Sequence, residues 1–221
     1  LALLCGMLAL ASKEDAALFP LYALLLELTV LGFRASNPST GRLLRHGFTG
    51  FAVAGLLVYL LWVTPHYWRW DAYPGRDFST LERLLTEGRV LVMYLGQILW
   101  PLPSRMPFFY DNFEISRGLM QPWTTLPSLL LIAALLAFAW RLRTRRPLLA
   151  FGILFFFAGH FMTSNVIGLE LVFEHRNQLP LVGIVLAATD LITLVIQRLK
   201  PGKLPICAAC ALAIVGLFAG T

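Results

Sequence analysis

A dense polar turn between two long apolar runs is the part of the chain best suited to chemistry. Glu174, His175 and Arg176 are consecutive, and Asn177 and Gln178 follow them. A histidine titrates near neutral pH, and an arginine offers a planar fork to a phosphate or a carboxylate. The alternative is an ordinary polar loop that caps the next helix, in which Glu174 and Arg176 form only a weak surface pair.

A second polar group, Ser12-Lys13-Glu14-Asp15, interrupts the apolar N-terminal region. Charged side chains close to a membrane interior are costly and indicate a functional site by default. Lys13 beside a helix N-terminus can hold a lipid phosphate, because its ammonium and the backbone N–H groups act on one anion. The alternative is an interfacial turn whose charges reach into water.

A third polar group lies along a single predicted helix and contains Arg83, Glu87, Arg89 and Tyr94. Arg83 and Glu87 are four residues apart, so they can pair on a helix surface. Either these side chains take part in a site, or they only stabilise their own helix.

A fourth polar group, from Arg105 to Arg117, includes Asp111 and Glu114. These carboxylates can serve as acids or bases, although solvated loop carboxylates are the commoner case. The aromatic residues before it are typical of an interfacial belt and can also stack on sugar rings: Trp62, His66, Tyr67, Trp68, Trp70 and Tyr73.

Other chemistries lack their sequence signatures. The chain has no glycine-rich phosphate loop, no zinc-ligand spacing and no nucleophile elbow. The four histidines are too scattered to predict a metal site. Cys207 and Cys210, like Cys5, lie in apolar runs, where we interpret them as small helix residues rather than as a redox pair.

The composition indicates a membrane protein. The chain is 58% hydrophobic and 14% charged, whereas soluble domains are about 45–50% apolar and about 25% charged. The net charge of +6 comes from basic residues in short loops between apolar runs, as in cytoplasmic loops of membrane proteins. We therefore expect membrane lipid rather than nucleic acid as a partner.

Eight apolar segments are long enough to predict an all-α fold, a polytopic transmembrane helix bundle with about seven to eight membrane segments. They are 1–11, 16–33, 48–64, 84–101, 126–140, 148–167, 178–196 and 204–220. We expect residues 1–221 to form a single transmembrane domain that is a fragment of a longer chain, with one segment broken or re-entrant.

The basic loops predict the orientation of this bundle. Arginines and lysines gather in 34–45, 141–146 and 198–203, which should all be cytoplasmic. The segment 84–101 then has both flanks on the opposite side. Its polar residues and the Pro101-Leu102-Pro103 end favour a re-entrant helix, and a spanning helix with one misassigned loop is the alternative.

Three stretches of the sequence together resemble a known family. They are Leu10-Ala-Ser-Lys-Glu14 followed by Pro20, Arg89-Val-Leu-Val-Met-Tyr94 with Trp100-Pro101, and Phe173 to Pro180. Their order and spacing resemble bacterial membrane proteins with C-terminal tetratricopeptide repeats. Those are similar to the eukaryotic transmembrane and tetratricopeptide O-mannosyltransferases, in the GT-C class of glycosyltransferases. The resemblance runs from the first residues to about Pro180.

The resemblance implies a membrane glycosyltransferase with a polyprenyl-phosphate-sugar donor and a protein or glycan acceptor. Transfer would occur on the periplasmic or lumenal face, in a bacterial inner membrane. No other cofactor is evident, no metal ligand is predicted, and metal dependence stays open. The general base would lie in a loop upstream of this chain, and the repeats are also missing. The matching positions for substrate or lipid phosphate are Lys13, Glu14, Arg89, Tyr94, Glu174, His175 and Arg176.

Two other functions fit the polar residues less fully. A transporter or flippase of a lipid-linked or anionic solute also uses broken helices and intramembrane charges, but most of the charges here lie at predicted helix ends. A non-catalytic membrane anchor for a repeat domain is the third hypothesis.

Overall fold

A computed structural model describes residues 2–12, 14–68, 73–102, 107, 110 and 113–199. Within these ranges the chain forms helices and connecting loops, and no strand. The all-α fold predicted from the sequence is therefore confirmed.

The N-terminal helices are interrupted where the charged residues predicted a break. α1 (Ala2–Ser12) ends at Ser12, and a 3₁₀ turn, η1 (Glu14–Leu18), leads into α2 (Phe19–Leu26). A π-helical turn, η2 (Glu27–Leu31), completes the segment. Ala16 and Leu18 of the 3₁₀ turn are buried, so this turn packs inward.

The longest apolar rod begins at α3 (Pro38–Val58) and continues through η3 (Tyr59–Val63) into α4 (Thr64–Tyr67). Asn37 starts it, because its side-chain oxygen accepts a hydrogen bond of 3.0 Å from the Ser39 N–H and so satisfies a helix-end donor. None of its most apolar window is buried inside the protein. Such a helix needs lipid around it.

Three helices of the described chain are long and apolar enough to cross a membrane: Pro38–Tyr67, Thr125–Leu142 and His175–Leu199. They contain the predicted segments 48–64, 126–140 and 178–196, respectively. The second is α6, and the third contains α8 (Gln178–Leu199). Segment 204–220 lies outside the described residues.

The prediction of a continuous apolar helix over 148–167 is wrong for the second half of that segment. α7 (Pro147–Gly159) ends at Gly159, and turns follow it. Polar side chains there bond to nearby backbone and compete with the helix. The Asn165 side-chain oxygen accepts a hydrogen bond of 2.7 Å from the Ile167 N–H, for example. At 13 residues α7 is too short to cross the bilayer on its own.

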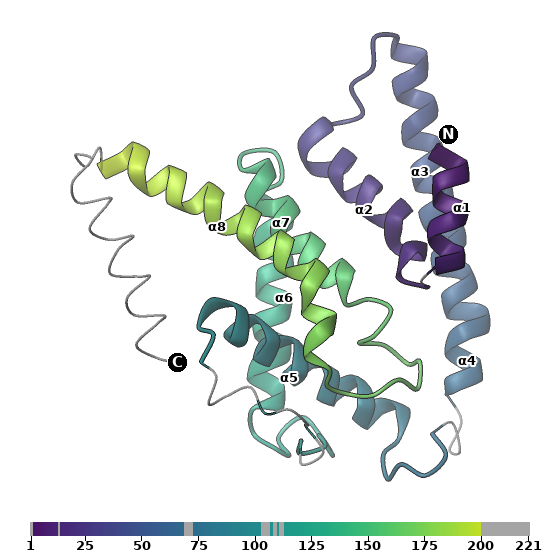
Figure 1. Cartoon of the computed structure of the whole chain (residues 1–221), viewed down its shortest axis with the longest axis vertical. Coiled ribbons are helices and arrows are strands. Elements are labelled where there is room, and N and C mark those ends of the chain that lie inside the picture. Colours follow the sequence, from purple (N-terminus) through teal and green to yellow (C-terminus); the bar gives the residue numbers. More distant parts are fainter. Residues whose placement is uncertain are drawn as a thin grey trace.

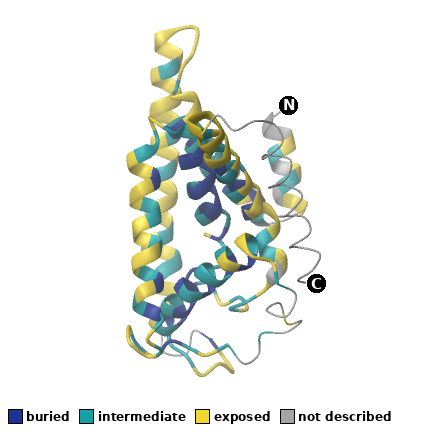
Figure 2. Ribbon diagram, turned by 90° about the vertical axis from the view of Figure 1, so that its left-hand side faces the viewer, coloured by how far each residue is buried: buried dark blue, intermediate teal, exposed yellow. Residues whose placement is uncertain are grey.

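The core lies around α7, which contacts α2, α6 and α8. Figure 2 shows the buried residues gathered in the interior of the molecule. α7 and α8 pack closely because glycines face each other. A Cβ on Gly152 would lie 2.2 Å from the Gly183 carbonyl oxygen, so only glycine allows this distance. Next to this contact lies a cluster of buried apolar residues, Ala139, Leu149, Ala150, Ile153 and Ala187.

The basic loops gather at one end of the bundle, the upper end in Figure 1. The start of α3, the turn between α6 and α7, and the end of α8 all lie there. We call this the basic end. The described parts of the connections 68–79, 100–124 and 160–177 lie in the lower half of the view, and we call that side the opposite end.

α5 (Thr80–Leu99) crosses α6 obliquely in the lower half of Figure 1. It is not one of the three candidate spans, because its buried face carries charged and polar side chains. The prediction that segment 84–101 is not wholly exposed to lipid is consistent with this packing.

Candidate functional site

α5 is built to present a polar face to the loops at the opposite end. A capping box starts it: the Glu82 carboxylate accepts a hydrogen bond of 2.7 Å from the Ser79 N–H, and the Ser79 hydroxyl accepts one from the Glu82 N–H. The residues at helical spacing that follow are buried, namely Arg83, Glu87, Val90, Tyr94 and Gln97. Four of these five have polar side chains, which must find partners in the packed loops.

Arg83 binds the loop after α7 with its whole guanidinium. It donates hydrogen bonds to the carbonyl oxygens of Asn165, Leu169 and Thr163, at 2.8, 2.7 and 3.1 Å. Its Nη2 also lies 3.1 Å from Glu87 Oε1. The predicted Arg83–Glu87 pair is confirmed, and it does more than stabilise its own helix because Arg83 fixes the course of residues 163–169.

Tyr94 fixes the other end of the same connection. Its hydroxyl accepts a hydrogen bond of 2.7 Å from the Phe173 N–H and donates one of 3.2 Å to the Phe173 carbonyl oxygen. Phe173 directly precedes the 3₁₀ turn Glu174–Asn177. Tyr94 is therefore a positioning residue for that polar turn.

Arg89 holds a different loop. Its Nη1 donates a hydrogen bond of 2.6 Å to the Glu114 carbonyl oxygen, and its guanidinium lies 5.0 Å from the centre of the Phe113 ring. Nearby, the Thr86 hydroxyl accepts a hydrogen bond of 2.9 Å from the Ser116 N–H. α5 thus anchors residues 113–116 as well as the connection 163–173.

In the polar turn, Arg176 pairs with Glu170. Its Nη1 donates a hydrogen bond of 2.5 Å to the Glu170 carbonyl oxygen, and its Nη2 lies 3.6 Å from Glu170 Oε2. Arg76 Nη2 lies 3.9 Å from Glu170 Oε1. Two guanidiniums therefore converge on one carboxylate, whose side chain is 59% exposed. His175 is exposed, with its ring against that of Phe173.

His160 is a buried residue of this region that sequence reasoning did not single out. It follows α7 directly, and its ring is stacked on Tyr94 at 5.2 Å and packed edge-on against Phe156. Burial lowers the pKa of His160 to about 4, against the opposing effect of Asn177. Its position at the end of a 13-residue apolar helix was the available signal for burial.

Glu87 is the second buried titratable group, and it lies outside the three candidate spans. Burial raises the pKa of Glu87 to about 7, although the Arg83 guanidinium acts in the opposite direction. Ser164 and Arg176 also favour the ionised carboxylate. Arg83, which holds the loop 163–169, is therefore paired with a carboxyl group whose pKa is near neutral pH.

The structure brings together part of the predicted site. Tyr94 and Arg176 both bind the connection between α7 and α8, Tyr94 at Phe173 and Arg176 at Glu170. Arg89 instead binds the separate loop 113–116. Lys13 and Asp111 lie outside the described residues. The side chains of Glu14 and Glu174 are likewise outside the description.

Over the described ranges, no three His, Cys, Asp or Glu side chains gather as a metal site would require. The described part of the opposite end carries five arginines and as many carboxylates, and several of them are paired, as Arg76 and Arg176 are with Glu170. A guanidinium that pairs with a carboxylate can also hold another anion. We found no match of the chain to a protein-family model, a curated protein or a solved structure.

Proposed function

We propose that this chain is the membrane domain of a GT-C-like glycosyltransferase. It moves a hexose from a polyprenyl-phosphate donor to a protein or glycan acceptor, at the opposite end of the bundle. In a bacterial cell this end would face the periplasm from the inner membrane. The family resemblance supports the reaction class, and the arginine pair on Glu170 supports the place.

The arginine pair is the observation that carries the proposal. Arg76 and Arg176 reach one exposed carboxylate from two different loops. A phosphate offers the same kind of oxygens to a guanidinium as a carboxylate does, with more charge. A donor phosphate at this end can therefore displace Glu170 and take both arginines.

This arrangement supplies one of the two requirements of sugar transfer. The bond between the anomeric carbon and the phosphate oxygen breaks, and a bond to the acceptor oxygen forms. The leaving polyprenyl phosphate carries the developing negative charge, which Arg76 and Arg176 stabilise. The acceptor hydroxyl gives its proton to a general base.

The remaining predicted residues take supporting roles in this proposal. Tyr94 and Arg83 hold the connection that carries Arg176, and Arg89 holds loop 113–116. Lys13 and Glu174 stay candidates for contact with the donor phosphate or the acceptor.

The test is sugar transfer from a labelled polyprenyl-phosphate-hexose by the full-length protein in membranes. Arg176→Gln should lower kcat/KM by about 10- to 100-fold, equivalent to roughly 1.4–2.8 kcal/mol of transition-state stabilisation. Glu170→Gln should lower KM, because it removes the competing carboxylate.

Arg143→Gln is the matched control, because Arg143 lies over the Trp140 ring in the turn between α6 and α7, at the basic end. It should leave kcat/KM unchanged. Unaltered transfer in both Arg76→Gln and Arg176→Gln would remove the proposed site. Flux of the lipid-linked sugar in proteoliposomes without any transfer would replace the enzyme with a transporter.

A further inference from the structure

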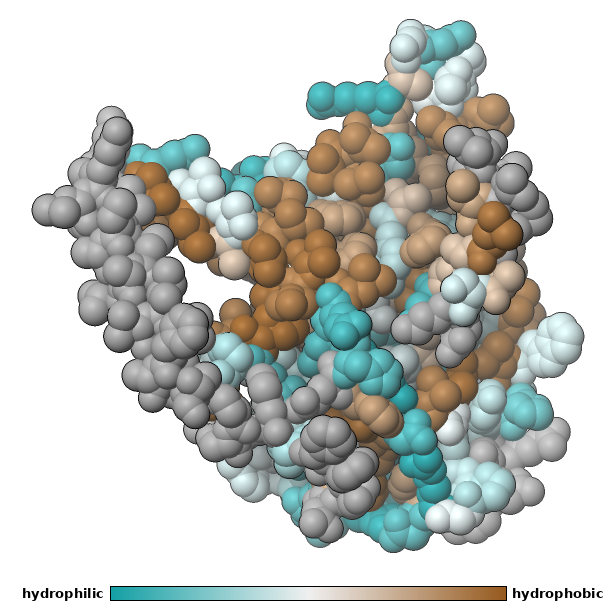
Figure 3. Space-filling view, in the orientation of Figure 1, coloured by the Kyte–Doolittle hydropathy of each residue, from teal (hydrophilic) through white to brown (hydrophobic). Residues whose placement is uncertain are grey.

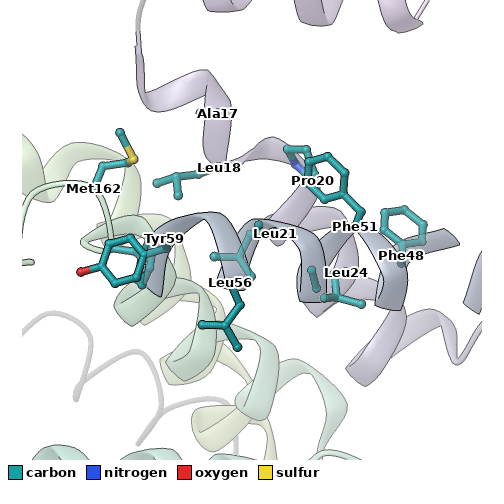
Figure 4. A pocket seen from close by; sticks show the side chains of 13 residues that line it. Ala17, Leu18, Pro20, Leu21, Leu24, Phe48, Phe51, Leu56, Tyr59 and Met162 are labelled. Carbon is teal, nitrogen blue, oxygen red and sulfur yellow. The ribbon is translucent and has the colours of Figure 1, made fainter. Parts of the chain in front are cut away.

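A half-open apolar groove of about 420 Å³ lies between α2 and α3. One wall is a stripe along α3 and the first residue of η3, at spacings of three and four residues, formed by Phe48, Phe51, Ala52, Gly55, Leu56 and Tyr59. Leu21 and Leu24 of α2 form part of the other wall, and Met162 lies near the Tyr59 end (Figure 4). The volume is in the usual range for a small-ligand pocket.

The groove lies along a helix that needs lipid around it. α3 belongs to a candidate span whose apolar window is not buried by the protein. Hydrocarbon chains are the solvent at this depth, and an apolar lining gives water too few polar partners to fill the space. A lipid chain is therefore the occupant that matches the lining.

The Phe48 end of the groove is strongly basic. The Phe48 ring lies 6.4 Å from the Phe33 ring, and the Arg45 guanidinium lies 5.4 Å from the centre of the Phe33 ring. Arg34 and Arg42 are exposed nearby in sequence. Hydrophilic side chains stand above the apolar surface at this end of the molecule in Figure 3.

Glu27, the acidic residue near the Phe48 end of the groove, already accepts a hydrogen bond from the protein. Glu27 accepts a hydrogen bond of 2.8 Å from the Phe33 N–H, and this bond helps to shape the turn between η2 and α3. One carboxylate against three arginines leaves a net positive charge at the mouth of the groove. Basic clusters beside membrane helices attract anionic lipid headgroups.

We propose that this groove binds an anionic phospholipid from the leaflet at the basic end. One acyl chain lies along the α3 stripe, and the headgroup phosphate interacts with Arg34, Arg42 and Arg45. This lipid is distinct from the sugar donor, whose proposed phosphate site is at the opposite end of the bundle.

Two glycines of α3 provide a matched pair of variants. A Cβ on Gly55 or on Gly50 would meet no atom within 4 Å, so a side chain can start from either position without a clash at its Cβ. Gly55 lines the groove and Gly50 does not. Gly55→Phe therefore fills the groove, and Gly50→Phe adds the same ring elsewhere on the same helix.

The experiment uses the full-length protein in nanodiscs that contain a trace of lipid with a photoreactive group in its acyl chain. Phosphatidylglycerol is the anionic probe and phosphatidylcholine is the zwitterionic one. The wild type should crosslink phosphatidylglycerol at the α3 stripe at least about fivefold more than phosphatidylcholine, roughly 1 kcal/mol of preference. Gly55→Phe should remove this labelling, and Gly50→Phe should retain it.

The headgroup contact has its own variant. Arg34→Gln combined with Arg45→Gln should reduce phosphatidylglycerol labelling to the level of phosphatidylcholine. Equal labelling by the two probes in the wild type, or equal loss in Gly50→Phe and Gly55→Phe, would overturn the proposal. Capture of residues 200–221 or of a second copy in the groove would also overturn it. Sugar transfer is a separate readout, so each proposal can fail alone.

Discussion

At the scale of single residues, two buried titratable groups have opposite pKa shifts. The pKa of Glu87 is raised to about 7, and the pKa of His160 is lowered to about 4, both chiefly by burial. Arg83, Ser164 and Arg176 face Glu87, while Asn177 and Arg176 face His160. Between about pH 4.5 and 7 the folded protein therefore holds up to one proton more than the unfolded chain at Glu87, and between about pH 4 and 6.5 it holds up to one fewer at His160.

These shifts predict a stability profile that single variants reveal. From about pH 4.5 to 7, unfolding releases the Glu87 proton, so this group makes stability fall as pH rises. From about pH 4 to 6.5, unfolding takes up a proton at His160, so this group makes stability rise with pH. Between about pH 4.5 and 6.5 the two groups therefore change the free energy of unfolding with pH in opposite directions, and their slopes cancel.

We expect Glu87→Gln to make the free energy of unfolding rise with pH across that range, relative to the wild type. His160→Phe should make it fall, and each slope should approach about 1.4 kcal/mol per pH unit. Chemical unfolding in detergent micelles at several pH values measures both. His175→Phe is the control, because His175 is exposed, and a slope change there would contradict the assignment. Parallel profiles for the two buried-site variants would do the same.

At the scale of elements, helix packing depends on glycines where α7 meets α8. A Cβ on Gly183 would lie 2.5 Å from the Gly152 carbonyl oxygen, and one on Gly152 would lie 2.8 Å from the Ala187 nitrogen. The obstructing atoms are backbone, which cannot move aside without separating the helices. The close contact is therefore a requirement of the core around α7.

Alanine substitutions should separate this requirement from helix propensity. Gly152→Ala and Gly183→Ala should each lower the midpoint of thermal unfolding in detergent, because overpacking costs about 1–3 kcal/mol. Gly47→Ala, where a Cβ meets nothing within 4 Å, should raise it slightly, because alanine favours a helix by up to about 1 kcal/mol. A stabilising effect at Gly152 would show that α7 and α8 are not in close contact.

At the scale of the whole molecule, the basic loops 34–45 and 141–146 and the end of α8 lie at one end, and the connections held by α5 lie at the other. In a membrane, the two ends face different compartments, and the basic end should be cytoplasmic. The proposed sugar donor and the proposed structural lipid would then lie in opposite leaflets.

Single cysteines test this arrangement in the full-length protein after Cys5, Cys207 and Cys210 are replaced by alanine. In intact cells, a membrane-impermeant thiol reagent should label His175→Cys, and should label Thr40→Cys and Thr144→Cys only after permeabilisation. Labelling of positions 40 and 144 from outside, with 175 protected, would place the proposed site in the cytoplasm.

The sequence predicted the features that depend on local pattern. The hydrophobic runs 126–140 and 178–196 located α6 and α8, and a spacing of four residues predicted the Arg83–Glu87 pair. The partners of Arg83 could not be predicted, since Asn165, Thr163 and Leu169 are 80 to 86 residues away. The burial of His160 and the end of α7 likewise depend on tertiary packing and on loop hydrogen bonds.

The anchoring of α5 has a consequence for how the protein is made. The carbonyl partners of Arg83 lie in residues 163–169, and the partner of Tyr94 is Phe173. A ribosome adding about 5–20 residues per second needs roughly 4–18 s to synthesise the residues between them. During that interval, Arg83 and Glu87 must be solvated by water or bound by a chaperone, because placing their charges in hydrocarbon is energetically costly. α5 should therefore reach its final place only after residues 163–173 have been synthesised.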